Sequence, residues 1–347
     1  YLVDILRFLD PDDATWDSMK ANYEQRLGVA YPSNQKPFDL LDVRRPDLKK
    51  ILLTCANTKV ALPYIDVVNE ILEQLMLSEE GAPAIDAYDV GDLSSADLLA
   101  EPANLLWDAY LGNAQVKGLG QLRYPLTLPF DLPLEMARAF LSQLGLELWQ
   151  VRERVNQPTA LNAAVDGETD GWRDVWYERL GLGPVDVEVL TTDVDWFSLY
   201  GYEDEATALT ELASAKKLAR RLGVSYIDLV EMTVRTRFVN ADPPVVLHAP
   251  HTGSDFDAVT LTASSAVPAG TSVAYALRKL NAFARLRKCL NWDIHDLDRV
   301  LTGLMGNVPP PDGEYASAMR TALVNLAHVL ELEARLEGGL TPEEVVL

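Results

Sequence analysis

Apolar residues recur at intervals of three and four along most of the chain, the spacing that places side chains on one face of an α-helix. Two such stripes are Ile65, Val68, Leu72 and Leu75, and Leu212, Ala215, Ala219 and Leu222. A third helical stretch is indicated by Val324, Ala327, Leu332 and Leu336, in which one interval is five residues. Glu70 and Glu73 fall outside the first stripe, so we expect them to face away from it. Because alternating, strand-like segments are scarce, the pattern predicts an all-α fold.

Tight turns with strong capping signals separate these expected helices. In RRLGVSYIDLVEM, Gly223 can take the left-handed conformation after one helix, Ser225 can cap the next, and Asp228 occupies the capping-box position. Related signals are Gly181, Gly183, Pro184 and Asp186; Asn291, Asp293 and Asp296; and Thr341, Pro342 and Glu344. Their spacing is irregular, so we expect an irregular helix–turn–helix array rather than a solenoid of fixed period.

Two segments interrupt the helical pattern. Residues 78–118 read as a polar loop excursion, and residues 240–271 as a loop with a short-strand insertion. The strand propensity is concentrated near 245–262, in VVLHAP and FDAVTLTA. An extended, proline-rich approach precedes a helix expected at 134–144, and its prolines are Pro125, Pro129 and Pro133.

The chain is strongly acidic, with a formal net charge of −22 from 52 acidic and 30 basic side chains. Repulsion of this size disfavours phosphate backbones and anionic lipid surfaces, so we expect no nucleic-acid partner. No run approaches the roughly 18 uninterrupted apolar residues of a membrane span, so we expect no membrane insertion by this segment. Basic residues cluster in two places, at Lys216, Lys217, Arg220 and Arg221, and at Arg278, Lys279, Arg285, Arg287 and Lys288. These clusters are either solvated helix faces or docking surfaces for an acidic partner.

Two segments deserve comparison with metal sites. His248 and His251 lie near Asp255 and Asp257, but the proline between the histidines excludes helical ligand spacing, and a polar loop is the better interpretation. In residues 166–178, four residues occupy the first, third, fifth and sixth positions of a calcium loop: Asp166, Glu168, Asp170 and Gly171. The twelfth position, which requires a bidentate Glu, is Tyr177, and Glu178 comes one residue late. We therefore expect no bound metal or cofactor.

Catalytic signatures are scarce as well. The chain has no GxSxG, Walker A, GxGxxG or CxxC pattern, so the sequence predicts no catalytic site. Cys55 and Cys289 are far apart in the sequence, and each is followed by an apolar residue. We expect each to be a small core residue rather than part of a disulfide framework or a metal site.

Three stretches together resemble the A component of bacterial Tc-type insecticidal toxin complexes. In LDVRRPDLKKILLTCANTKVALPYIDVVNEILE, residues 41–73, the RRPDL, CxNT and LPYIDLVNE elements of that family are present, with Val67 at the family's Leu position. YPLTLPFDLPLEMARAFLSQLGL, residues 124–146, is similar to the family's LPFDLPLE segment. LNAFARLRKCLNWDIHDLDRVL, residues 280–301, is similar to a helix pair of the family, although Leu-Gly-Trp has become Leu-Asn-Trp.

The resemblance implies structural roles, rather than catalytic ones, for the residues that match the family's motifs. These positions are Arg44, Arg45, Pro46, Asp47, Pro63, Tyr64, Asp66, Asn69, Glu70, Pro129, Asp131, Pro133 and Trp292. Some family members are labelled neuraminidase-like, but the chain contains no sialidase motif, and that activity is not carried over.

The resemblance implies a fold and a function. The family's A component is a very large secreted protein that assembles as a bell-shaped pentamer, whose mostly helical shell encloses a channel for a toxic polypeptide. We therefore expect residues 1–347 to be a fragment of an α-helical shell domain, with the other subunits and toxin components as partners. The chain starts within a helical pattern and shows no signal peptide, so a secreted location follows from the resemblance alone.

Two other interpretations remain open. The chain could be a stand-alone helical scaffold that reuses the shell fold to recruit a protein partner, or a metal-dependent or glycoside-cleaving enzyme built on its acidic loops. The acidity adds a hypothesis about an assembly: protonation of carboxylates at low pH would reduce repulsion between subunits, so their contacts should depend on pH.

Overall fold

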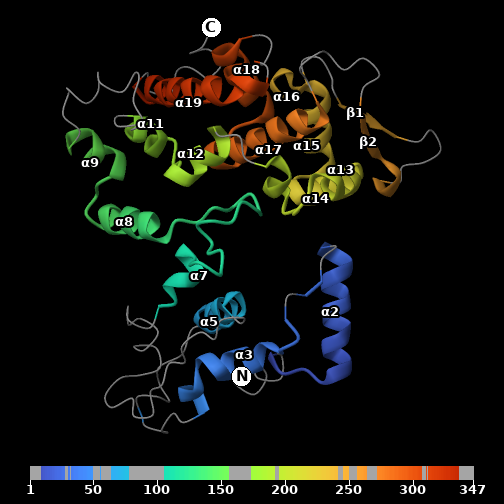
Figure 1. The fold of residues 1–347 in the computed structure, drawn as a ribbon. Helices are drawn as coiled ribbons and strands as arrows, with labels where there is room; N and C mark the ends of the chain where they lie inside the picture. Colours follow the sequence, from blue (N-terminus) through green and yellow to red (C-terminus); the bar gives the residue numbers. More distant parts are fainter. Residues whose placement is uncertain are drawn as a thin grey trace. The chain divides into compact units, whose positions relative to one another are not determined.

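The computed structural model describes residues 9–27, 30–31, 33–49, 55, 64–77, 105–155, 173–191, 195–240, 245–249, 256–263, 272–306, 310 and 312–335. This part of the chain is mostly helical and has one small two-stranded sheet, which confirms the expected fold class (Figure 1). The chain divides into two compact units, Tyr1–Leu119 and Gly120–Leu347, a division that the sequence patterns did not predict.

The first unit is built from short helices. They are α2 (Asp13–Leu27), α3 (Pro37–Arg44), the 3₁₀ helix η1 (Pro46–Lys49), α5 (Tyr64–Met76) and α7 (Trp107–Leu111). The chain enters α3 through Pro37, which suits the first turn of a helix because that position needs no N–H donor. One apolar cluster contains Leu9, Leu40, Leu41 and Ile71, and a second contains Leu77, Leu106 and Ala109. Helix α7 and its buried Ala109 thus lie within the segment expected as a polar loop at 78–118, of which residues 78–104 lie outside the described residues.

Helix α5 buries a different face from the one that its apolar stripe predicted. Ile65 and Leu72 are exposed, whereas Glu70 and Glu73 are buried together with Ile71. The prediction was wrong because it assumed that acidic side chains face solvent. In the folded unit, cationic and hydroxyl partners from elsewhere in the chain compensate the cost of burying them.

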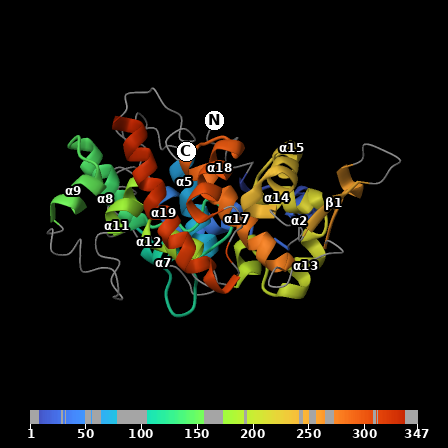
Figure 2. The same cartoon turned by 90° about the horizontal axis from the view of Figure 1, so that it is seen from above.

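The second unit contains the remaining elements. They are α8 (Leu132–Gln143), α9 (Leu148–Val155), α11 (Arg173–Arg179), α12 (Pro184–Thr191), η3 (Trp196–Tyr200), α13 (Glu205–Leu212), α14 (Ala215–Leu222), α15 (Tyr226–Val230), the π-helix η4 (Glu231–Arg235), α16 (Arg237–Asn240), β1 (Val245–His248), η5 (Phe256–Ala258), β2 (Thr260–Ala263), α17 (Val273–Leu290), α18 (Ile294–Met305) and α19 (Asp312–Arg335). In both views α19 lies alongside α18, and the two helices contact each other (Figures 1 and 2).

Helix α17 is the central element of this unit. Every residue from Tyr275 to Leu286 is buried, and the surrounding helices pack against it, with η3 and α16 among them. One of the two interpretations of this basic cluster, a solvated helix face, is therefore wrong for Arg278, Lys279 and Arg285, which are all buried. The guanidinium of Arg278 lies over the ring of Tyr315, with 4.6 Å to the ring centroid, so an aromatic face replaces part of its water.

The predicted turns are confirmed where the structure describes them. Gly223 takes the left-handed conformation, and the Ser225 hydroxyl accepts the backbone N–H of Asp228 at 3.1 Å. Asn291 takes the role of Gly after α17, with a φ of 54°, and Asp293 caps α18. These local hydrogen bonds define where the helices begin and end.

The short strands are confirmed near 245–262. Strands β1 and β2 are antiparallel, with Leu247 opposite Leu261. The backbone N–H of Leu261 donates to the Ala213 carbonyl at 2.7 Å, and the N–H of Ala215 donates to the Val259 carbonyl at 3.1 Å, so the ribbon is attached to the start of α14.

The other two apolar stripes agree with the structure to different degrees. The stripe of α13 and α14 is confirmed, since Leu212, Ala215, Ala219 and Leu222 are all buried. In α19, Ala327 is buried but Leu332 is exposed, and the inward face instead carries Tyr315, Met319, Leu323 and Leu326. Among the described residues, no helix is long and apolar enough to cross a membrane.

Candidate functional site

The motif residues of the first unit meet in a buried ion pair. Arg44 is the last residue of α3, and its Nε lies 2.6 Å from Oε2 of Glu70 on α5. Arg44 is 2% exposed and Glu70 is 7% exposed, so both charges are removed from water. Such a pair holds two helices in a defined orientation, because separating its members would leave each charge buried and unpaired.

A second acid on α5 extends this pair into a polar cluster. The Tyr110 hydroxyl, on α7, donates a hydrogen bond to Oε1 of Glu73. Burial raises the pKa of Glu73, and the neighbouring charge of Glu70 acts in the same direction. We call Arg44, Glu70, Glu73 and Tyr110 the Arg44 cluster. It joins the three helices α3, α5 and α7.

The other motif residues of the first unit have positions around this cluster. Arg45 caps the end of α3 and is 1% exposed, while Pro46 and Asp47 begin η1. Tyr64 and Asn69 are exposed on α5, and Asp66 is half-buried in its first turn. Pro63 lies outside the described residues. Of these residues, the structure brings together Arg44 and Glu70 and leaves Tyr64 and Asn69 at the surface.

The second unit has a buried polar centre on α17. Nε of Arg285 donates to Oδ1 of Asn281 at 2.8 Å, and its two terminal nitrogens donate to the carbonyls of Leu128 and Arg123. The Asn281 amide in turn donates to the Leu199 carbonyl at 3.1 Å. We call Asn281 and Arg285 the Arg285 cluster. It ties the proline-rich segment 123–129 to the central helix.

The charge of Arg285 is maintained although the side chain is buried. Burial lowers the pKa of Arg285 to about 10, and the nearby carboxylate of Asp186 opposes this shift. The guanidinium is therefore charged at neutral pH. Its terminal nitrogens donate to backbone carbonyls, which makes it a positioning group for the segment 123–129 rather than a free reactive group.

The second motif segment supplies a helix start. Asp131 is the N-cap of α8, and its side chain accepts the Leu134 backbone N–H at 3.0 Å. Pro133 is the second residue of that helix, where a missing N–H costs nothing, and Pro129 is half-buried in the segment held by Arg285. The family-like LPFDLPLE residues thus serve to position α8.

The third motif segment supplies a cap that acts over a long range in the sequence. Asp298, on α18, is buried, and its carboxylate accepts the backbone N–H groups of Arg237 at 3.0 Å and Phe238 at 2.8 Å. It therefore caps α16, about 60 residues earlier in the chain. Trp292, in the turn between α17 and α18, is half-buried.

The described residues of the two metal-like segments do not converge on one point. Among the described residues, no group of three or more His, Cys, Asp or Glu side chains could hold a metal ion. Glu178, the late acid of the calcium-like segment, is buried against two cations, with Arg138 Nε at 2.6 Å and an Arg152 nitrogen at 3.7 Å. Its carboxylate is therefore already used in an ion-pair network. His248 is exposed on β1, whereas His251, Asp255 and residues 166–171 lie outside the described residues.

The two cysteines are not core residues, which corrects the expectation from the sequence. Cys55 and Cys289 are both exposed. Cys289 lies in the last turn of α17, where the helix leaves the core, and its Sγ donates to the Leu180 carbonyl at 3.1 Å. Although the residue as a whole is exposed, burial of the thiol itself raises the pKa of Cys289, so it is a poor nucleophile.

Several of these residues could not be selected from the sequence. In the sequence, Arg285 is one member of a basic cluster, and Asp298 is one of several acids after a turn. Their common signal is membership of the segment 280–301, although neither is among the motif positions that the resemblance implies. Together, the described side chains of these clusters and caps hold helices and loops in place.

No protein-family model, no curated protein and no solved structure matches the chain.

Proposed function

We propose that the chain is a structural module of a helical shell, in the A component of a secreted toxin translocation machine. The proposal is supported by the contacts of the charged motif residues, which are made to other parts of the same chain. Arg44 and Glu70 pair with each other, and Asp131 caps a helix. In an enzyme, motif residues of these types would converge on a substrate, whereas here they hold elements together.

The energetics of these contacts favour a scaffold. A buried charge pair contributes little net stability, but it disfavours arrangements in which the charges lose each other. The Arg44 cluster meets this description. The Arg285 cluster contains no ion pair, but its buried guanidinium donates to Asn281 and to two backbone carbonyls. Each cluster joins segments that are distant in the sequence. Residues placed in this way specify the relative positions of helices, which is what a protein wall requires.

The resemblance supplies the wider part of the proposal. The module would enclose a channel, pack against other subunits of a pentamer and be secreted with the remaining toxin components. The net charge of −22 adds a physical expectation, because subunits of this charge repel one another at neutral pH and less so as their carboxylates are protonated. A stand-alone scaffold that recruits a protein partner is the alternative proposal.

The natural gene product tests the proposal directly. We would purify the polypeptide encoded by the complete reading frame, measure its mass, and image the particles by electron microscopy with an antibody raised against residues 1–347. We expect a very large polypeptide that forms pentamers, with the antibody on the outer wall. A product of a few hundred residues that stays monomeric would overturn the proposal and favour the stand-alone scaffold.

A further inference from the structure

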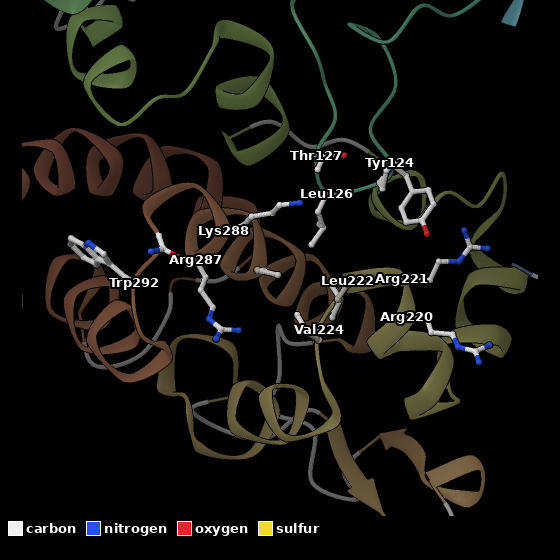
Figure 3. A pocket seen from close by; sticks show the side chains of 14 residues that line it. Tyr124, Leu126, Thr127, Arg220, Arg221, Leu222, Val224, Arg287, Lys288 and Trp292 are labelled. Atoms are coloured by element: carbon white, nitrogen blue, oxygen red, sulfur yellow. The ribbon is translucent and has the colours of Figure 1, made fainter. Parts of the chain in front are cut away.

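A pocket of about 380 Å³ opens in the second unit (Figure 3). Three parts of the chain line it: the segment Tyr124–Thr127, the end of α14 with the turn that follows it, and the last turns of α17 with Trp292. A volume of this size accommodates a small ligand or a few residues of a peptide.

The lining of this pocket is cationic, in contrast to the chain as a whole. Four basic side chains contribute to it, Arg220, Arg221, Arg287 and Lys288, whereas the net charge of the chain is −22. Arg287 is partly compensated by Asp228, with 3.3 Å between Arg287 Nη2 and Asp228 Oδ1. The other three carry charge that no carboxylate of the described residues pairs with.

Aromatic rings hold one of these cations in place. The guanidinium of Arg221 lies 4.9 Å from the ring centroid of Tyr124 and 4.5 Å from that of Tyr202. Stacking of this kind orients the guanidinium. Its N–H donors lie in the plane of the group and the rings lie against its faces, so the donors stay available. Arg220 and Lys288 are exposed, so their charges are accessible from solvent.

Helix ends explain part of this arrangement but not all of it. Basic residues in the last turn of a helix interact favourably with its dipole, and Arg220, Arg221, Arg287 and Lys288 occupy the last turns of α14 and α17. That effect accounts for cations on each helix separately. It does not account for the fact that two such helix ends line the same pocket, together with the apolar residues Leu126, Leu222 and Val224.

The geometry points to an extended acidic peptide of a partner protein as the ligand, and we propose that this pocket is its docking site. Arg287 and Lys288 lie on one side, Arg220 and Arg221 on the other, and Leu126, Leu222 and Val224 lie between them (Figure 3). A compact anion would need cations that converge on one point. Two separated cationic rims with an apolar centre instead match a segment whose carboxylates flank an apolar side chain.

The 347-residue chain is sufficient to test this proposal, so the test does not rest on the proposed shell function. We would titrate the chain into the fluorescein-labelled hexapeptide EDLVDE and follow fluorescence anisotropy at low and moderate salt. The matched peptides are EDGGDE, which keeps the charges without the apolar centre, and KKLVKK, which reverses them. Unlabelled EDLVDE and inorganic phosphate serve as competitors.

Two double variants separate the pocket from the overall charge. Arg220→Glu with Lys288→Glu reverses one exposed cation on each rim, and neither residue has an ion pair with a described residue. Arg26→Glu with Arg154→Glu makes the same change in net charge at exposed positions of α2 and α9 that do not line the pocket. Circular dichroism would verify that both variants fold.

We expect saturable binding of EDLVDE that weakens with salt, about tenfold or more weaker binding to the pocket variant, and little change in the control variant. EDGGDE should bind more weakly than EDLVDE, and KKLVKK should not bind. The proposal is overturned if EDLVDE does not saturate, if the two variants behave alike, or if EDGGDE or phosphate binds as tightly as EDLVDE.

Discussion

The acidic residues of α5 show how paired polar side chains decide which face of a helix is buried. Glu70 and Glu73 face inward because Arg44 and Tyr110 meet them there, and Ile65 and Leu72 are exposed as a consequence. An unpaired buried carboxylate would be too costly to keep, so the partners decide which face is buried. At this scale the Arg44–Glu70 pair is the contact on which the arrangement of α3 and α5 depends.

Replacing one member of this pair should be worse than replacing both. Arg44→Met leaves Glu70 buried without its cation, and we expect a loss of about 3–5 kcal/mol in the stability of α3 and α5. In the double variant Arg44→Met with Glu70→Met, no charge is stranded, so the loss should be smaller. Hydrogen exchange of peptides from α3 and α5 measures both. A double variant less stable than the single one would contradict the argument.

At the scale of elements, α16 depends on a residue outside its own segment. It is a four-residue helix whose first N–H groups have their acceptor in Asp298 of α18. Most helix starts that the sequence identified use a residue next to the helix, such as Ser225 or Asp293. A cap supplied from a distant helix also joins the two elements, because each loses a partner if they separate.

Asp298→Ala should therefore destabilise the second unit more than the loss of a local cap. The variant leaves the N–H groups of Arg237 and Phe238 without their acceptor in a buried place, at an expected cost of about 2–3 kcal/mol. Asp298→Asn keeps one acceptor and should fall between this variant and the unchanged chain. Asp204→Ala removes the exposed cap of α13 and serves as the control with a smaller loss. Urea unfolding followed by circular dichroism gives the order, and equal losses for Asp298→Ala and Asp204→Ala would refute it.

At the scale of the whole molecule, the described core residues form separate groups. The large cluster around α17 lies within Gly120–Leu347, and the two smaller clusters lie within Tyr1–Leu119. Each unit thus has its own buried apolar side chains, which is the condition for a unit that unfolds by itself. Among the described residues, the two clusters of the first unit contain fewer buried side chains than the cluster around α17, and the Arg44–Glu70 pair joins α3 and α5 in addition to them.

Core substitutions should consequently act within one unit. Leu40→Ala is expected to destabilise α3 and α5 by about 2–5 kcal/mol, and hydrogen exchange in α17 and α19 should stay as in the unchanged chain. Phe283→Ala should produce the reverse pattern. Equal loss of protection in both units after either substitution would show that the chain unfolds as one cooperative body.

The local features of this protein can be predicted from its sequence. Helix starts and ends were predicted at Gly223, Ser225 and Asn291, and the short strands near 245–262 were predicted as well, because caps, turns and strand propensity involve residues that are neighbours in the chain. The stripe from Leu212 to Leu222 was predicted for the same reason.

Which charged residues are buried depends on contacts that form in the folded chain. Arg44 and Glu70 are 26 residues apart, and Arg285 and the Leu128 carbonyl are 157 apart, so no local pattern relates them. A charged side chain whose partner is distant in the sequence is predicted to be exposed. It is buried only because folding brings the partner next to it. The orientation of α5 and the burial of the basic residues of α17 both depend on such long-range contacts.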